Sequence, residues 1–192
     1  MTKDWFEYKL YVYDLDDTLY RETDYLYAAY ARIAAACTAD KAEQTVYTDY
    51  LCRSFREDGR QGLFQRFKER FRVEMSIEEM LLLLRHTECP LRLYETREQE
   101  IRTLLGKGKS VVILTNGNPE QQRQKVHNLR LAELFPQIEI IYAAETASKP
   151  SPIALLQRIA KEPIEKHEVL LIGDSVTDEQ TALYAGVDYK SI

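Results

Sequence analysis

The sequence predicts an α/β protein: a core with a parallel sheet, interrupted after its first strand by an all-helical insertion. Residues 10–13 (LYVY) form a short apolar run that ends in acids, as expected of a buried strand that meets a loop. Residues 23–89 show helical periodicity and no convincing strand. From residue 96 onward, apolar strands alternate with amphipathic helices, which is typical of a parallel sheet with right-handed crossovers.

These observations divide the chain into two domains. We expect residues 1–20 and 91–192 to form the α/β core, and residues 21–90 to form a helical domain inserted into it. A chain of 192 residues is long enough for one ordinary core and a modest insertion.

The inserted segment predicts four short helices. Each has a capping residue or apolar residues at helical spacing, and the four signals are Thr23, Asp40 with Glu43, residues 63–71, and Ser76 with Glu79. Helices of this length pack as antiparallel neighbours in small bundles.

The second half predicts alternating helices and strands. We expect Thr96 with Gln99 to cap its first helix. Further strands are expected at residues 110–116, 138–145, 169–175 and 187–192. The helices between them are expected to begin at Asn118-Pro119, at Ser151-Pro152 and near Asp178.

Composition excludes several classes of protein. The net charge of −5 does not favour binding to nucleic acid or to an anionic membrane surface. Cys37, Cys52 and Cys89 are odd in number and lack CxxC spacing, so we expect reduced thiols without a disulfide or a zinc site. No apolar run has membrane-spanning length and the start has no apolar leader region, so we expect a cytoplasmic protein.

Polar residues follow four successive predicted strands. They are Asp14, Asp16 and Thr18 after the first, Thr115, Asn116 and Gly117 after the second, Lys149 after the third, and Asp174 and Asp178 after the fourth. In an open α/β sheet, ligands bind outside the carboxyl ends of the strands. A lone DxD would more often be a solvated acidic turn, but four such strand ends together predict a site.

This set of groups suits phosphoryl transfer. A carboxylate can attack phosphorus and hold it as an acyl phosphate, which divides one difficult hydrolysis into two easier steps. Mg²⁺ held by carboxylates would neutralise the charge between the two anions, and a lysine and a hydroxyl would bind the phosphoryl oxygens. A second carboxylic acid would protonate the leaving group and then deprotonate water.

The segments DLDDTL, TNGN, SKPSP and GDSVTD resemble, in order and spacing, the four motifs of the haloacid dehalogenase superfamily. The resemblance extends from Tyr11 to Ile192, and the helical insertion resembles the small C1-type cap of that superfamily. It implies a Rossmann-like core of the haloacid dehalogenase type, and a Mg²⁺-dependent phosphoric monoester hydrolase.

The resemblance also implies roles for individual residues. Asp14 would be the nucleophile and a Mg²⁺ ligand, and Asp16 the general acid/base that also lends its backbone carbonyl to the metal. Thr18 would orient Asp16. The phosphoryl group would be bound by Thr115, Asn116 and Gly117, with Thr18 beside them. Lys149 would neutralise charge, Asp174 would complete the metal site, and Asp178 would hold Lys149 or the water shell of the metal.

Other polar residues have simpler interpretations. Asp17 is expected to be exposed and without a role, and Asn118 could either cap a helix or line the site. His86, His127 and His167 are expected at the surface. The insertion is rich in tyrosine and arginine, which would pack and solvate the bundle; among the arginines, Arg53, Arg56 and Arg60 are the candidates for substrate contacts.

The leading hypothesis is a phosphatase that acts on a small phosphorylated metabolite, as a monomer or a homodimer. The TNGN segment and the YDLDDTLY opening resemble those of family members that hydrolyse nucleoside monophosphates or sugar phosphates, which implies a substrate of that kind. Asp16 argues against carbon–halogen chemistry, because haloacid dehalogenases lack an acid/base aspartate at that position. The alternatives are a phosphomutase of the β-phosphoglucomutase kind and a non-enzymatic phospho-acceptor or phosphate-binding protein. The order of the acids disfavours a receiver domain, which carries its acceptor on the third strand.

Overall fold

The computed structural model describes residues 5–192, and the chain forms two compact units. One unit comprises the chain up to Arg21 together with Leu91–Ile192, and the other comprises Glu22–Pro90.

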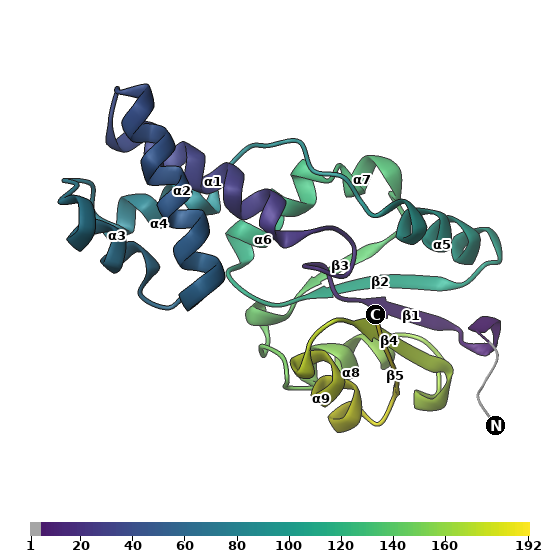
Figure 1. Cartoon of the computed structure of the whole chain (residues 1–192). Helices are drawn as coiled ribbons and strands as arrows, with labels where there is room; N and C mark the ends of the chain where they lie inside the picture. The colour runs from purple at the N-terminus through teal and green to yellow at the C-terminus, as the bar shows by residue number, and fades with distance from the viewer. Residues whose placement is uncertain (1–4) are drawn as a thin grey trace. The chain divides into compact units, whose positions relative to one another are not determined.

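The first unit is built around a parallel sheet of five strands in the order β3-β2-β1-β4-β5 (Figure 1). The strands are β1 (Leu10–Tyr13), β2 (Ser110–Thr115), β3 (Glu139–Tyr142), β4 (Val169–Gly173) and β5 (Asp188–Ser191). In the central strand, Leu10 lies opposite Ser110 of β2 on one side and Val169 of β4 on the other. The predicted α/β class with a parallel sheet is confirmed.

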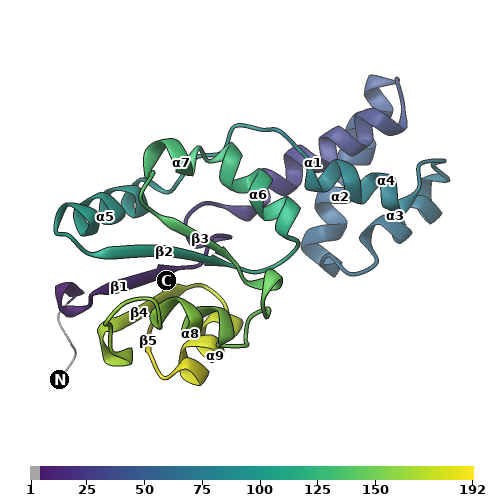
Figure 2. The ribbon, with the colours of Figure 1, turned by 180° about the vertical axis from the view of Figure 1, so that it is seen from behind.

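Helices cover both faces of this sheet (Figure 2). Helices α8 (Ile153–Ile159) and α9 (Val176–Ala185) pack on the face that carries Leu10 and Val12. Helices α5 (Glu95–Gly106), α6 (Pro119–Asn128) and α7 (Leu131–Leu134) lie on the other side. Because both faces are covered, all four residues of β1 are buried, which explains why this strand reads as an unbroken apolar run.

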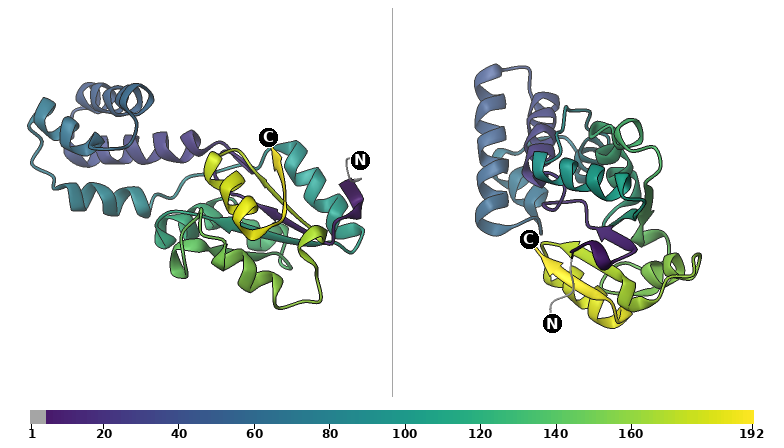
Figure 3. Two further views of the ribbon diagram at one scale, coloured as in Figure 1. Left: turned by 90° about the horizontal axis from the view of Figure 1, so that it is seen from below. Right: turned by 90° about the vertical axis from the view of Figure 1, so that its right-hand side faces the viewer.

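The second unit consists of four helices, seen from two further sides in Figure 3. They are α1 (Glu22–Cys37), α2 (Lys41–Asp58), α3 (Leu63–Phe71) and α4 (Ile77–Arg85). The Asp40 side chain accepts hydrogen bonds from the first-turn N–H groups of α2, and Ser76 with Glu79 forms a complete capping box on α4. The Asp40 cap and the Ser76–Glu79 box are therefore confirmed. The predicted box of Asp40 with Glu43 does not form, because the Glu43 carboxylate accepts from the Thr38 hydroxyl at 2.7 Å instead.

Aromatic side chains hold the four-helix unit together. The ring of Tyr30 packs against Phe55 and Phe64, and the rings of Tyr47 and Tyr50 pack against a second group of aromatic rings formed by Phe67 and Phe71. The hydroxyl of Tyr25 donates to the carbonyl of Leu84 at 2.6 Å, which ties α1 to the end of α4. The tyrosines therefore have a structural role within this unit.

Local differences from the prediction have physical causes. Helix α5 begins at Glu95 with Tyr94 at its cap position and without a side-chain cap, so the predicted Thr96 cap is wrong. The Tyr94 N–H donates to the carbonyl of Leu19 at 2.8 Å, and this tertiary contact fixes where the chain turns into the helix. Thr23 likewise lies inside α1, which starts at Glu22.

Among the residues that the structure describes, no helix combines the length and the apolar character that crossing a bilayer requires.

Candidate active site

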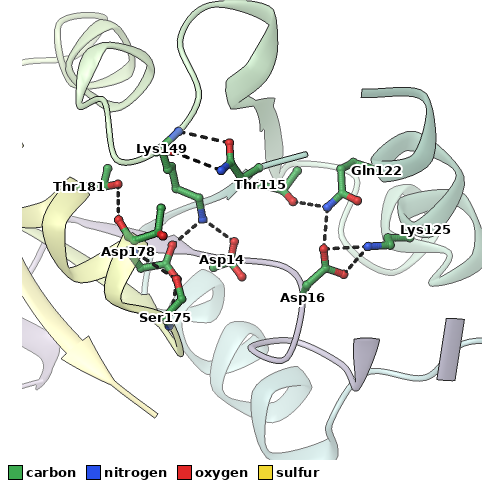
Figure 4. A network of polar contacts seen from close by, with 12 residues as sticks. Asp14, Asp16, Thr115, Gln122, Lys125, Lys149, Ser175, Asp178 and Thr181 are labelled. Carbon is green, nitrogen blue, oxygen red and sulfur yellow. Dashed lines mark hydrogen bonds and ion pairs between the residues drawn. The ribbon is translucent and has the colours of Figure 1, made fainter. Parts of the chain in front are cut away.

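Four strand ends of the α/β unit bring together a group of polar residues, most of them buried, and Figure 4 shows the network of contacts among them. Asp14 directly follows β1, and its backbone N–H continues the strand pairing by donating to the carbonyl of Ile172 at 2.9 Å. Thr115 ends β2, Asp174 follows β4, and Lys149 lies in the loop that follows β3. Since the strands are parallel, these ends share one edge of the sheet.

Lys149 occupies the centre of the network. Its Nζ atom donates to Oδ1 of Asp14 and to Oδ1 of Asp178, each at 2.5 Å, and all three side chains are buried. The Asn116 side chain fixes the backbone of Lys149: its Oδ1 accepts from the Lys149 N–H at 3.2 Å, and its Nδ2 donates to the Lys149 carbonyl at 3.3 Å. Two loops that are distant in sequence are thereby joined at the site.

Burial perturbs the ionisation of these groups. It raises the pKa of Asp14 from 3.8 to about 7; Lys149 opposes this shift, and the neighbouring acids Asp178 and Asp16 add to it. Burial alone lowers the pKa of Lys149, but the carboxylates of Asp14 and Asp178 outweigh that effect, so the net shift is upward. The pKa of Asp174 is also raised, first by burial and then by Asp178 and Asp17. The site therefore concentrates more negative charge than it neutralises.

The excess charge makes this a candidate cation site. One carboxylate oxygen each from Asp14, Asp174 and Asp178 lies within 4.8 Å of the others. Three carboxylates and one ammonium leave two negative charges, the amount that a divalent cation would neutralise. Carboxylate oxygens are the donors that Mg²⁺ prefers. The residues present therefore fit the metal that the sequence predicts.

Asp178 differs from the other two acids because both of its oxygens already have donors. Lys149 binds Oδ1, while the Ser175 hydroxyl donates to Oδ2 at 2.6 Å and the Ser175 N–H does so at 3.3 Å. Asp178 also lies against Gly173, where an added Cβ would come within 2.6 Å of its carboxylate. Asp174 is exposed and makes no such set of contacts among the described residues.

Asp16 belongs to a second group of contacts beside the first (Figure 4). The Lys125 Nζ lies 2.8 Å from both carboxylate oxygens, the Tyr20 hydroxyl donates to Oδ1 at 2.6 Å, and Gln122 Nε2 donates to Oδ2 at 2.8 Å. Gln122 Nε2 also lies 2.5 Å from the Thr115 hydroxyl oxygen. Lys125 and Gln122 were missed in the sequence. The available signal was their spacing of three residues on one face of α6, next to the buried Val126.

Thr18 does not make its predicted contact. Its side chain is fully buried, and its hydroxyl has no hydrogen-bond partner among the residues that the structure describes. The expectation that Thr18 orients Asp16 is therefore wrong for this structure, because Tyr20, Gln122 and Lys125 bind that carboxylate instead.

The remaining predicted residues lie at the surface. Asp17 is exposed, as expected, and has a φ of +54°, a left-handed conformation that suits glycine and that aspartate tolerates. Asn118 is exposed and caps α6 by accepting from the Gln121 N–H at 3.1 Å, which favours the cap over the site-lining role.

The other surface residues are histidines and arginines. The three histidines are exposed, as are Arg53, Arg56 and Arg60. Within its own unit, Arg60 forms an ion pair with Glu22 at 2.9 Å.

Residues 8–186 match the model of the haloacid dehalogenase-like hydrolase family, so the chain belongs to that family of hydrolases. A phosphoglycolate phosphatase from Nitrosospira multiformis is 38% identical over 60 residues, which is 30% of this chain. That match spans about a quarter (26%) of the length of the curated relative.

Solved structures show the same fold. The candidate HAD-hydrolase YfnB from Bacillus subtilis, bound to magnesium, superposes with a TM-score of 0.64 at 20% identity, over 97% of this chain and 87% of that one. A Thermotoga maritima protein described as a candidate β-phosphoglucomutase superposes with a TM-score of 0.73 at 14% identity, over 95% and 84% of the two chains.

Proposed function

We propose that the protein is a Mg²⁺-dependent phosphatase that hydrolyses a small phosphorylated metabolite through an aspartyl-phosphate intermediate. The observation that carries the proposal is that the carboxylates of Asp14 and Asp16 lie in different surroundings. Asp14 is buried against Lys149, whereas Asp16 is held separately beside Thr115 by the donors of α6 and Tyr20. Two acids in unlike environments can take the unlike roles that hydrolysis of a phosphate ester requires.

In the first half-reaction, the Asp14 carboxylate attacks phosphorus and the bond to the leaving oxygen breaks. Lys149 balances the negative charge of Asp14 and of the phosphoryl group. Thr115 and the backbone N–H groups of Asn116 and Gly117 bind the phosphoryl oxygens. Asp16 donates its proton to the leaving oxygen, so the alcohol departs neutral.

In the second half-reaction, the Asp16 carboxylate takes a proton from water. The oxygen of that water attacks phosphorus, and the bond between phosphorus and Asp14 breaks. The products are inorganic phosphate and regenerated Asp14, with the proton left on Asp16 for the next cycle.

Asp14 and Asp174, with the backbone carbonyl of Asp16, would hold the metal ion. When bound, Mg²⁺ supplies positive charge that lets the anionic nucleophile and the anionic phosphate approach each other. In this assignment Asp178 acts through Lys149, which agrees with the engagement of both its oxygens.

The substrate is proposed to be a small phosphate ester such as a nucleoside monophosphate or a sugar phosphate. The relative that acts on phosphoglycolate supports a small phosphorylated metabolite. We assign the Glu22–Pro90 unit as the cap domain, with its exposed Arg53, Arg56 and Arg60 as candidates for contacts to anionic groups of the substrate. We further propose a cytoplasmic enzyme, monomeric or dimeric.

A phosphomutase is the second candidate, because the fold is shared with a candidate β-phosphoglucomutase and an aspartyl phosphate can be passed to a sugar hydroxyl as well as to water. The chemistry separates the two: a phosphatase releases inorganic phosphate, whereas a mutase isomerises a sugar phosphate without net release.

The test is a screen of nucleotides, sugar phosphates and phosphoglycolate, with Mg²⁺ and with EDTA. We expect phosphate release that requires the metal. Asp16→Ala should then accumulate protein that is heavier by one phosphoryl group after exposure to an aryl phosphate, whose leaving group departs with little help from an acid, and mass spectrometry detects the added mass. Asp17→Gly, which removes the adjacent exposed acid at a backbone conformation that suits glycine, is the matched control and should turn over without accumulation. Metal-independent turnover, or an Asp16→Ala variant that turns over like the control, would contradict the proposal.

A further inference from the structure

Helix α6 presents two buried polar side chains to the acid/base Asp16. Lys125 is 1% exposed and Gln122 is 3% exposed, although long polar side chains on a helix are usually solvated. A buried lysine is unfavourable unless its charge is paired, and Lys125 is paired with Asp16 through both carboxylate oxygens at 2.8 Å.

The contacts hold the whole Asp16 carboxylate in one orientation. Oδ1 accepts from Tyr20 and Lys125, and Oδ2 accepts from Gln122 and Lys125. Each of the two carboxylate oxygens therefore has two donors, one of them Lys125. Both the rotation of the carboxylate and its distance from the sheet edge are thereby set by α6 and Tyr20.

Gln122 also connects Asp16 to the proposed phosphate site. Its Nε2 atom lies between Oδ2 of Asp16, at 2.8 Å, and the hydroxyl of Thr115, at 2.5 Å. A single amide group therefore fixes the spacing between the acid/base and the hydroxyl at the end of β2. That spacing decides whether the acid reaches the leaving oxygen of a bound phosphate ester.

We propose that Lys125 and Gln122 are positioning residues that aim the Asp16 carboxyl group at the leaving oxygen. The inference rests on the proposed phosphatase function. In this inference, two residues of α6 that lie one helical turn apart orient Asp16. Thr18 does not orient it here. Proton donation by Asp16 then depends on Lys125 and Gln122, whereas attack by Asp14 does not.

The distinction between these two steps makes the inference testable through the leaving group. An aryl phosphate such as p-nitrophenyl phosphate releases a stable phenolate and needs little help from an acid. An alkyl phosphate such as glycerol phosphate releases a basic alkoxide and needs the proton. The value of kcat/KM reports only the steps up to departure of the leaving group, so later hydrolysis of the aspartyl phosphate does not enter it.

Lys125→Met keeps the length of the side chain and removes its charge. We expect kcat/KM for the alkyl phosphate to fall about 10- to 100-fold, because general acid catalysis and its geometry contribute effects of that size. For the aryl phosphate we expect a fall of less than about 3-fold, and inhibition by inorganic phosphate should be nearly unchanged. Gln122→Met should act in the same direction, and it keeps the test available if Lys125→Met does not fold.

Lys161→Met is the matched control, because Lys161 is an exposed lysine paired with Glu139 on the surface. It should leave both substrates unchanged. A purely structural ion pair between Lys125 and Asp16 would depress both substrates equally in folded protein, and that result would overturn the inference, as would an unchanged alkyl phosphate rate. The alkyl ester is the one that the unaltered protein hydrolyses fastest in the panel of nucleotides, sugar phosphates and phosphoglycolate. If the unaltered protein hydrolyses no ester of that panel, the proposed function itself fails, and the inference fails with it.

Discussion

Asp14→Asn should make the metal-free protein more stable while abolishing its activity. The pKa of Asp14 is raised from 3.8 to about 7, mainly by burial and against the attraction of Lys149, so the folded state disfavours the ionised carboxylate by about 3 pH units. At about 1.36 kcal/mol for each unit, ionising Asp14 costs the fold up to about 4 kcal/mol. Asparagine has nearly the same shape and does not carry that charge.

The effect has a defined dependence on pH. A raised pKa in the folded state means that the stabilising contribution is complete below the unfolded pKa, 3.8, and is lost as the pH rises through about 7. The two proteins should therefore be nearly equal near pH 4, and Asp14→Asn should be more stable by about 2 to 4 kcal/mol at pH 8. Below pH 4 the carboxyl group is neutral, and the advantage of asparagine disappears.

Urea denaturation in EDTA at both pH values measures the difference. With a slope of about 2 kcal/mol per molar urea, the midpoint of Asp14→Asn at pH 8 should lie about 1 to 2 M higher. Adding Mg²⁺ should stabilise the unaltered protein and have little effect on the variant, because binding to the folded state alone stabilises it. An Asp14→Asn variant that is equal to or less stable than the unaltered protein at pH 8 in EDTA would refute the reasoning.

Three further perturbations test other features. Gly173→Ala should lower the free energy of unfolding by about 1–3 kcal/mol in urea melts, because its Cβ would lie 2.6 Å from an Asp178 carboxylate that Lys149 and Ser175 hold in place. Asp17→Val should destabilise the fold by about 1–2 kcal/mol because φ is +54°, whereas Asp17→Gly should stay within about 1 kcal/mol; equal effects of the two in thermal melts would contradict this assignment. The free energy of unfolding should also fall above pH 10. Burial raises the pKa of Tyr30, and it raises the pKa of Tyr8 to about 12, so the folded state disfavours the ionised phenolates that form in the unfolded chain above pH 10. Tyr30→Phe should flatten the decline in melting temperature between about pH 10 and pH 12.

The fold class could be predicted because the physical signal is local. Leu10–Tyr13 is apolar throughout since both faces of β1 are covered, and Asp40, Ser76 and Asn118 cap their helices with their own side chains. The start of α5 could not be predicted in this way. A hydrogen bond from Tyr94 to Leu19, distant in sequence, decides it.

The same distinction between local and tertiary signals separates the site residues that could be predicted from those that could not. Asp14, Thr115, Lys149 and Asp174 could be placed from the sequence because each lies in a loop at the end of a strand, or ends a strand. Gln122 and Lys125 could not, because long polar residues on a helix normally face solvent and their partner Asp16 lies more than one hundred residues earlier.

The connectivity of the two units has a consequence for synthesis on the ribosome. The central strand β1 is made early, but its partners Ser110 and Val169 follow much later, and all residues of the helical unit are made in between. Glu22–Pro90 is one continuous segment, so its four helices can associate while the sheet is still incomplete. The apolar Leu10–Tyr13 segment meanwhile has no strand partner, so it is exposed to aggregation until β2 and β4 have been made.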